Sequence, residues 1–179
     1  AEAGKHVLCE KPLSMDAAEA QTLLDARNRT GVLMQEAFMV RSHPQWVRAR
    51  EVVRSGRIGE LRAVQGFFSY YNTDPTNIRN MADIGGGSIY DIGCYPTVGS
   101  RFVFEDEPTR VVALIEYDPV MKTDRLASAI LDFPGGQASW VCSTQLSPYQ
   151  RMQIVGTKGR VEIEIPFNAP SDRSCRLWV

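Results

Sequence analysis

Two short segments of the chain carry side chains that could exchange a proton with a bound ligand. The first is Glu10-Lys11-Pro12, which directly follows an apolar run at 6–10. At the carboxyl end of a strand in a doubly wound sheet, a lysine points at whatever occupies the ligand crevice. Pro12 restricts Lys11 to extended backbone, and the bond between them is a candidate for the cis form. The tripeptide by itself is also compatible with an exposed loop lysine that precedes a helix.

The second segment runs from Gly85 to Tyr95 and opens with three glycines. Glycines let the backbone approach another surface closely, and a helix is predicted directly after them. In a regular helix, Ser88, Asp91 and Tyr95 fall at i, i+3 and i+7 and form one polar stripe. The segment lacks the glycine spacing of a phosphate-binding loop. The structural alternative is a half-buried core tyrosine with an aspartate placed by the helix dipole.

The elements around Lys11 indicate a parallel α/β unit. The apolar runs at 6–10 and 32–35 are predicted to be short buried strands. Between them a helix is predicted over about 15–30, with Ser14 as its cap and Gly31 as its end. Strand, helix and strand with tight connections are typical of the end of a doubly wound sheet.

The pattern changes after residue 40. A helix is predicted over about 43–55, with Pro44 in its first turn, and another over about 88–104, which Pro96 should bend just after Tyr95. Alternating residues and glycine-containing hairpin turns predict strands at about 60–71, 109–118, 124–133, 137–146, 150–156 and 160–165. We therefore expect an α+β fold with a mostly antiparallel, open-faced sheet of about six strands and helices on one face.

Bulk composition argues against several classes of function. The 179 residues carry a net charge of −1, and no apolar run approaches the roughly 18 residues of a membrane span. Neither nucleic acid nor a membrane is therefore an expected partner. The four cysteines lack zinc-type spacing and there are only two histidines, so we expect no metal site. Reduced thiols in a cytoplasmic protein are the preferred interpretation.

Taken together, the two segments resemble the glucose–fructose oxidoreductase, inositol dehydrogenase and rhizopine catabolism (Gfo/Idh/MocA) family of oxidoreductases. The motif Glu10-Lys11-Pro12 after a strand is followed, about 75–80 residues later, by G-G-G-x-x-x-D-x-G-x-Y. The segment 36–44 resembles the one that joins the two domains in that family. Residues 91–96, Asp-Ile-Gly-Cys-Tyr-Pro, resemble the branch of D-xylose dehydrogenases and dimeric dihydrodiol dehydrogenases, whereas other branches place His at the position of Tyr95.

The resemblance covers nearly the whole chain and implies two domains. Residues 1–40 would be the C-terminal remnant of a dinucleotide-binding (Rossmann) domain, and residues 41–179 the substrate-binding and dimerisation domain. The family's first strand and glycine fingerprint are not matched. The chain opens at Ala1 in what resembles a helix end and stops within an apolar run at 175–179, so we expect truncation at both ends.

The roles that the resemblance implies agree with elementary chemistry. Oxidising a secondary alcohol needs hydride transfer to a nicotinamide and removal of the hydroxyl proton. Tyr95 would take that proton as general base. The Lys11 ammonium within about 4–6 Å would lower a phenol pKa that is ordinarily about 10. Asp91, one turn before Tyr95, would orient the lysine or bind substrate hydroxyls, so that these three residues form the catalytic set.

The expected function is that of an NAD(P)-dependent oxidoreductase acting on a monosaccharide, a polyol or a related diol. The cofactor is NADP or NAD, and its side of the site is predicted to be lined by Glu10, Lys11, Pro12 and Arg41. Arg41 equally fits an interdomain salt bridge. Two alternatives stay open, namely an NAD-dependent glycosidase of the same family and a non-catalytic relative that kept the fold.

We expect a homodimer or a higher homo-oligomer formed through the open sheet. One face of the strand predicted at 137–146 carries small neutral polar residues that suit either a protein partner or solvent: Gln137, Ser139, Val141, Ser143 and Gln145.

Overall fold

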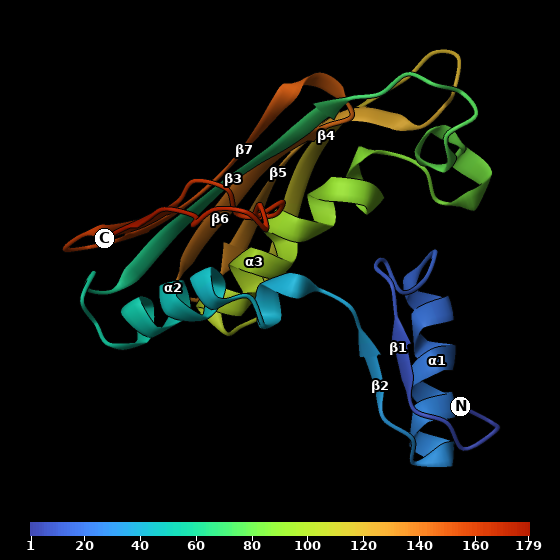
Figure 1. Ribbon diagram of the computed structural model, residues 1–179, viewed down its shortest axis with the longest axis horizontal. Helices are drawn as coiled ribbons and strands as arrows, with labels where there is room; N and C mark the ends of the chain where they lie inside the picture. The colour runs from blue at the N-terminus through green and yellow to red at the C-terminus, as the bar shows by residue number, and fades with distance from the viewer. The chain divides into compact units, whose positions relative to one another are not determined.

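The computed structural model describes residues 1–179 and shows two compact units, Ala1–Phe38 and Met39–Val179 (Figure 1). The first is a small parallel α/β unit. The second is an α+β domain built on one large sheet.

The first unit consists of β1 (Val7–Cys9), α1 (Ala17–Thr30) and β2 (Met34–Glu36), and its two strands pair in parallel. Strand, helix and strand therefore follow one another as predicted. The predicted burial of the strands is wrong on one face, because Leu8 is 73% exposed and Leu33 is 71% exposed. The two-stranded sheet has only one face covered by α1 within this unit (Figure 1).

The cap of α1 also differs from the prediction. Asp16, rather than Ser14, is the N-cap, and its Oδ1 accepts a hydrogen bond from the Glu19 N–H over 2.8 Å. The Ser14 hydroxyl instead donates to the Asp16 carbonyl. The helix ends as predicted at Gly31, whose φ of 69° is the left-handed conformation that glycine adopts without strain.

The second unit has a seven-stranded sheet, one strand more than predicted, in the order β4-β5-β6-β3-β7-β8-β9. All neighbouring pairs are antiparallel except β3 and β6, which are parallel. The mostly antiparallel sheet is therefore confirmed. Its strands are β3 (Leu61–Tyr71), β4 (Arg110–Tyr117), β5 (Asp124–Phe133), β6 (Gly136–Ser143), β7 (Gln145–Gly156), β8 (Arg160–Ile163) and β9 (Leu177–Trp178).

Helices cover one face of this sheet, as predicted (Figure 1). They are α2 (Pro44–Arg54) and α3 (Cys94–Phe104). The unit also has three short 3₁₀ turns, namely η1 (Met39–Arg41), η2 (Ile78–Asn80) and η3 (Ala82–Ile84). Trp46 of α2 is fully buried against α3 at Gly99, where an added Cβ would lie 2.6 Å from an indole carbon. The close approach of the two helices therefore depends on the absence of a side chain at Gly99.

The helix predicted at 88–104 is not one regular helix. It begins with a five-residue π-helical turn, η4 (Ile89–Gly93), and continues directly as α3. Pro96, which cannot donate a backbone hydrogen bond, lies in the first turn of α3. The irregular turn thus precedes Tyr95, whereas the sequence placed a bend after it. Turns of this type inside helices are frequent at functional sites.

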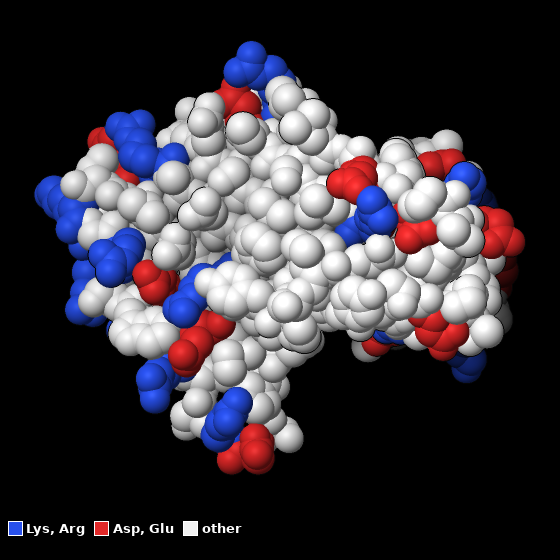
Figure 2. All heavy atoms as spheres, turned by 90° about the horizontal axis from the view of Figure 1, so that it is seen from above, with Lys and Arg blue, Asp and Glu red and all other residues white.

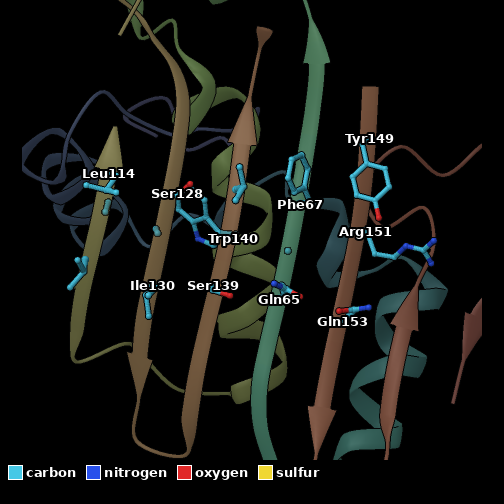
Figure 3. Close-up of a pocket in the computed structure, with 15 residues that line it drawn as sticks. Gln65, Phe67, Leu114, Ser128, Ile130, Ser139, Trp140, Tyr149, Arg151 and Gln153 are labelled. Atoms are coloured by element: carbon cyan, nitrogen blue, oxygen red, sulfur yellow. The ribbon is translucent and has the colours of Figure 1, made fainter. Parts of the chain in front are cut away.

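The opposite face of the sheet is uncovered. Its side chains line a shallow hollow of about 530 Å³ that crosses five neighbouring strands, in the order β4, β5, β6, β3 and β7 (Figure 3). Large apolar residues remain exposed there, including Val112 at 60%, Leu114 at 80% and Ile130 at 51%. Few charged side chains lie over the middle of this face (Figure 2). Ser139 and Val141 of the predicted polar face line the hollow, but Ser143 is buried and donates to the Arg125 carbonyl.

No helix in either unit combines the length and the apolar character that crossing a membrane requires.

Candidate functional site

The segment with Lys11 lies at the carboxyl ends of two parallel strands. Cys9 at the end of β1 pairs with Glu36 at the end of β2, and the Ala37 N–H donates to the Cys9 carbonyl over 2.8 Å. Lys11 follows β1 directly, and the Lys11–Pro12 bond is cis. This edge is where ligands bind in open α/β sheets.

Glu36 is a residue of this edge whose role the sequence did not indicate. Its Oε1 accepts a hydrogen bond from the Leu13 N–H over 2.7 Å, which ties the turn after Pro12 to the end of β2. Lys11 is half-buried, while Glu10 and Pro12 are exposed. The structure therefore brings Glu10, Lys11 and Pro12 together on a turn that a carboxylate holds in place.

Asp91 lies in η4 and is held by two donors from other elements. The Tyr70 hydroxyl on β3 donates to Asp91 Oδ2 over 2.6 Å, and Arg79 Nε on η2 donates to the same oxygen over 3.1 Å. Only 14% of the Asp91 side chain is exposed. Two charge-assisted hydrogen bonds in a poorly solvated position fix the direction of the carboxylate.

Tyr70 is a donor in this arrangement and not a base. Burial, and then the hydrogen bond to Asp91, raise the pKa of Tyr70 far above its ordinary value. Its phenol therefore stays protonated throughout the physiological pH range. Sequence analysis missed both Tyr70 and Arg79, because each lies 12 or more positions from Asp91 with no shared helical or strand spacing.

The start of η4 is capped by Asp124 at the beginning of β5. Asp124 Oδ2 accepts hydrogen bonds from the Ser88 hydroxyl over 2.6 Å and from the Ile89 N–H over 2.7 Å. Gly87 has a φ of 131°, and a Cβ there would collide with the Asp124 carboxylate. The predicted close approach at the glycines is thus an approach to a buried carboxylate, and burial raises the pKa of Asp124.

The predicted polar stripe of three residues is wrong at Ser88. Its side chain is fully buried and points to Asp124, whereas Asp91 and Tyr95 are half-buried. The spacing argument assumed 3.6 residues per turn throughout, and the π-helical turn changes the angle between successive side chains. Asp91 and Tyr95 remain neighbours along one irregular helix.

Tyr95 packs among aromatic rings on the helix-covered side of the sheet. Its ring centroid lies 5.8 Å from that of Phe68 in an edge contact and 5.4 Å from that of Phe167 in a tilted contact. Phe68 belongs to β3, and Phe167 follows β8. The ring of Tyr95 is therefore packed and only partly exposed. The half-buried tyrosine that the sequence offered as an alternative describes this environment correctly.

Arg41 ends η1, which packs against α3. It lines a separate surface hollow of about 370 Å³ together with Arg50, Arg101 and residues at the end of α3. Within that hollow Arg101 donates to Glu107 over 2.7 Å, and Arg50 lies 3.8 Å from Glu105. The place of Arg41 on the cofactor side stays a prediction.

The predicted catalytic residues belong to different units. Asp91 and Tyr95 lie together in the second unit, and Lys11 lies in the first. The pairing of Lys11 with Tyr95 therefore remains a prediction, as do the roles of both residues.

The comparisons with known proteins agree with this architecture. The family model described as the GFO/IDH/MocA C-terminal domain matches residues 46–162. The model described as the oxidoreductase family, NAD-binding Rossmann fold, matches residues 1–38. The chain belongs to the Gfo/Idh/MocA family of oxidoreductases.

Two curated relatives match nearly the whole length of the chain. The chain is 52% identical to an uncharacterised oxidoreductase of Rhizobium meliloti over 99% of its own length and 53% of the relative. It is 36% identical to a D-xylose 1-dehydrogenase (NADP(+)) of Haloferax volcanii, over 99% of the chain and 54% of that enzyme. The chain thus spans about half the length of the curated relatives it matches.

A solved structure supports the fold over both units. A 3-ketoreductase of Actinomadura kijaniata, in complex with NADP and TDP-benzene, matches with a TM-score of 0.90 at 28% identity. The match covers 98% of this chain and 55% of that one.

Proposed function

We propose that the protein is an NAD(P)-dependent oxidoreductase that transfers a hydride between a nicotinamide cofactor and a CH–OH group of a sugar, polyol or related diol. The observation that carries the proposal is the placement of Asp91 and Tyr95 on one irregular helix, with Asp91 held by two donors. The D-xylose dehydrogenase and the NADP-bound ketoreductase among the relatives support the substrate class and the cofactor.

Tyr95 is the residue that we assign to proton exchange with the substrate hydroxyl. Its half-buried ring is fixed by aromatic neighbours, so the phenol oxygen has a defined position. Tyr70 is unsuited to this step, because its proton is held by Asp91 and its pKa is raised. Asp91 accepts hydrogen bonds from its two donors and offers a fixed acceptor for the Lys11 ammonium or a substrate hydroxyl.

The cofactor supplies hydride transfer when bound. The turn after β1 fits its nicotinamide side, since a lysine ammonium at the carboxyl edge of parallel strands can donate to a ribose hydroxyl. In this proposal Glu10 and Pro12 shape that turn, Glu36 anchors it, and Arg41 contributes from the second unit.

The test uses a fusion of this chain with the part of the Rhizobium meliloti relative that the match does not cover. Nicotinamide absorbance is followed with NADP and with NAD over a panel of aldoses, polyols and cyclic diols. Tyr95→Phe should lower kcat by about 10²- to 10⁴-fold with cofactor binding retained. Tyr117→Phe, which removes the hydroxyl of a tyrosine 58% exposed on β4, is the matched control and should leave turnover unchanged.

Two outcomes would overturn this assignment. Unchanged turnover in the Tyr95→Phe variant would remove the phenol from the mechanism. Release of phenol from an aryl glycoside, without net reduction of the cofactor, would favour the glycosidase.

The same proposal includes a homodimer formed through the uncovered face of the sheet. The hollow on that face is lined by apolar and small neutral side chains, with Arg151 as its one charged residue. Phe67 and Tyr149 lie edge-to-face at 5.3 Å on neighbouring strands and offer aromatic area to a second copy (Figure 3). A contiguous exposed apolar patch of this kind is typical of a surface that binds a protein partner or a ligand.

Light scattering of the protein as it elutes from a size-exclusion column measures its molar mass and so tests the dimer. Leu114→Glu places a charge in the hollow and should shift the protein to the monomer. Val120→Glu changes a residue that is equally exposed, at 83%, but lies outside the hollow, and should leave the assembly unchanged. A monomeric unsubstituted protein, or equal effects of the two variants, would contradict the proposed interface.

We also place the protein in the cytoplasm, on the grounds that all four cysteines are free thiols. Thiol labelling after acid quenching of cells should find four reduced cysteines, and a disulfide would argue for an oxidising compartment.

A further inference from the structure

The segment that follows β8 contacts Tyr95 through the ring of Phe167. Phe167 in this segment is 1% exposed. Its ring stacks on Phe68 at 4.8 Å with an interplanar angle of 25°, and on Trp46 at 6.2 Å with the same angle. The third ring that it touches is Tyr95, at 5.4 Å and 45°. Phe167 therefore joins the helical core of the domain to the ring of the candidate proton carrier.

The backbone around Phe167 is held by side chains from two other elements. Gln150 Oε1 on β7 accepts hydrogen bonds from both the Phe167 N–H, over 2.9 Å, and the Asn168 N–H, over 3.0 Å. On the other side, Trp46 Nε1 donates to the Pro166 carbonyl over 2.8 Å. The backbone is thus held on both sides of Phe167, which therefore has little freedom to move away from Tyr95.

These contacts matter because proton transfer depends strongly on geometry. Phe68 and Phe167 both contact the Tyr95 ring, so the plane of that ring is determined by the packing of two neighbours. Displacement of a reacting group by about 1 Å can lower a rate by about 10²-fold even when its chemistry is unchanged. Loss of the Phe167 ring would leave Tyr95 with space into which it could tilt.

We propose that Phe167 is a positioning residue for Tyr95, and that Gln150 keeps Phe167 in place. Phe167 itself touches neither substrate nor cofactor in this proposal. It acts by fixing the phenol oxygen in the orientation that proton exchange requires. The proposal rests on the proposed function, because it assigns significance to the position of Tyr95.

Phe167→Leu in the fusion enzyme tests the proposal against a matched control. Phe133→Leu removes a ring that is also buried, at 4%, and stacked, on Phe104 at 4.4 Å, but that does not contact Tyr95. Both variants should lower the thermal midpoint. Phe167→Leu alone should lower kcat, by about 10- to 100-fold, with the KM for the cofactor unchanged. Equal effects of the two variants on kcat would overturn the proposal.

A second comparison is independent of any cavity in the core. Gln150→Met removes the acceptor of the two N–H groups at similar side-chain volume, whereas Gln150→Glu retains an acceptor oxygen. We expect lowered kcat in the first variant and substantial rescue in the second. Lowered kcat in neither, or an equal loss in both, would show that Gln150 does not hold the segment through this acceptor.

A double variant separates this proposal from the proposed function. If Phe167 acts through Tyr95, then Phe167→Leu should lower kcat little further in a Tyr95→Phe background. If Phe167→Leu lowers kcat in the Tyr95→Phe background as much as it does alone, the positioning role is overturned while Tyr95 stays in the mechanism. Unchanged activity of Tyr95→Phe itself would instead overturn the proposed function.

Discussion

Substitution of Asp124 tests whether a buried carboxylate holds the helix that carries Asp91 and Tyr95. Asp124 is 8% exposed, and its Oδ2 accepts from the Ser88 hydroxyl and the Ile89 N–H. Asp124→Ala leaves both donors buried without their acceptor. An unsatisfied buried donor costs about 1–3 kcal/mol, so two donors set the loss at about 2–6 kcal/mol.

Part of this loss is offset, because Asp124→Ala also removes a buried charge. We therefore expect the free energy of unfolding to fall by about 2–4 kcal/mol, in the lower part of that range. Asp124→Asn keeps one acceptor oxygen, so it should lower the free energy of unfolding by about 1 kcal/mol less than Asp124→Ala does. Urea denaturation of the 179-residue protein, followed by tryptophan fluorescence and by circular dichroism, measures both variants.

The matched control is Asp132→Ala at the other end of the same strand. Asp132 pairs with Arg110 at 3.1 Å on the surface, and an exposed pair of this kind contributes only about 0–1 kcal/mol. If Asp124→Ala lowers the free energy of unfolding no more than Asp132→Ala does, then Asp124 does not cap η4.

The pH dependence of stability supplies a second check on Asp124. Burial raises its folded-state pKa above the ordinary value of 3.8, so between these two pKa values the folded state binds more protons than the unfolded state. The contribution of this group to stability is therefore complete below pH 3.8 and is lost as the pH rises through the folded-state pKa. Asp124→Asn should remove that decline, which a series of urea titrations at different pH values would detect.

Three further predictions concern other sites. Asp118 accepts hydrogen bonds from Gln145 and two backbone N–H groups, which lower its pKa to about 2. Its contribution to stability is therefore present above pH 3.8 and is lost as the pH falls towards 2, and Asp118→Asn should abolish this acid-dependent loss in urea titrations. Gly99→Ala should lower the free energy of unfolding by about 1–3 kcal/mol by collision with a buried indole, whereas Gly135→Ala, with no atom within 4 Å, should change it by less than about 0.5 kcal/mol. Tyr70→Phe should lower kcat/KM of the fusion enzyme by about 10- to 150-fold, because a charge-assisted hydrogen bond to the Asp91 carboxylate is worth about 1.5–3 kcal/mol. Unchanged kinetics would remove Tyr70 from the candidate site.

Local pattern was enough to predict most elements and the class of fold. Val161 and Ile163 alternate with polar residues along β8 and are both fully buried, as a two-residue period requires. Gly31 ends α1 because its left-handed backbone is open to glycine at little cost. These features depend on interactions over a few residues, which the order of residue types contains directly.

The motif E-K-P, followed at a distance by G-G-G-x-x-x-D-x-G-x-Y, identified the family and proposed two candidate site residues in the second unit. It did not identify what holds them. Asp91 is 21 positions from Tyr70, and Ser88 is 36 positions from Asp124. No period links such pairs, because each depends on which strands and turns pack together.

The amino-acid sequence alone therefore determined the chemical types at the candidate site and the helices and strands that carry them. Tertiary structure decided the parallel pairing of β3 with β6, the π-helical turn before Tyr95 and the packing of Phe167 on that tyrosine. The physical reason is that propensity and periodicity act along the chain, whereas ring packing and buried hydrogen bonds act between segments far apart in it.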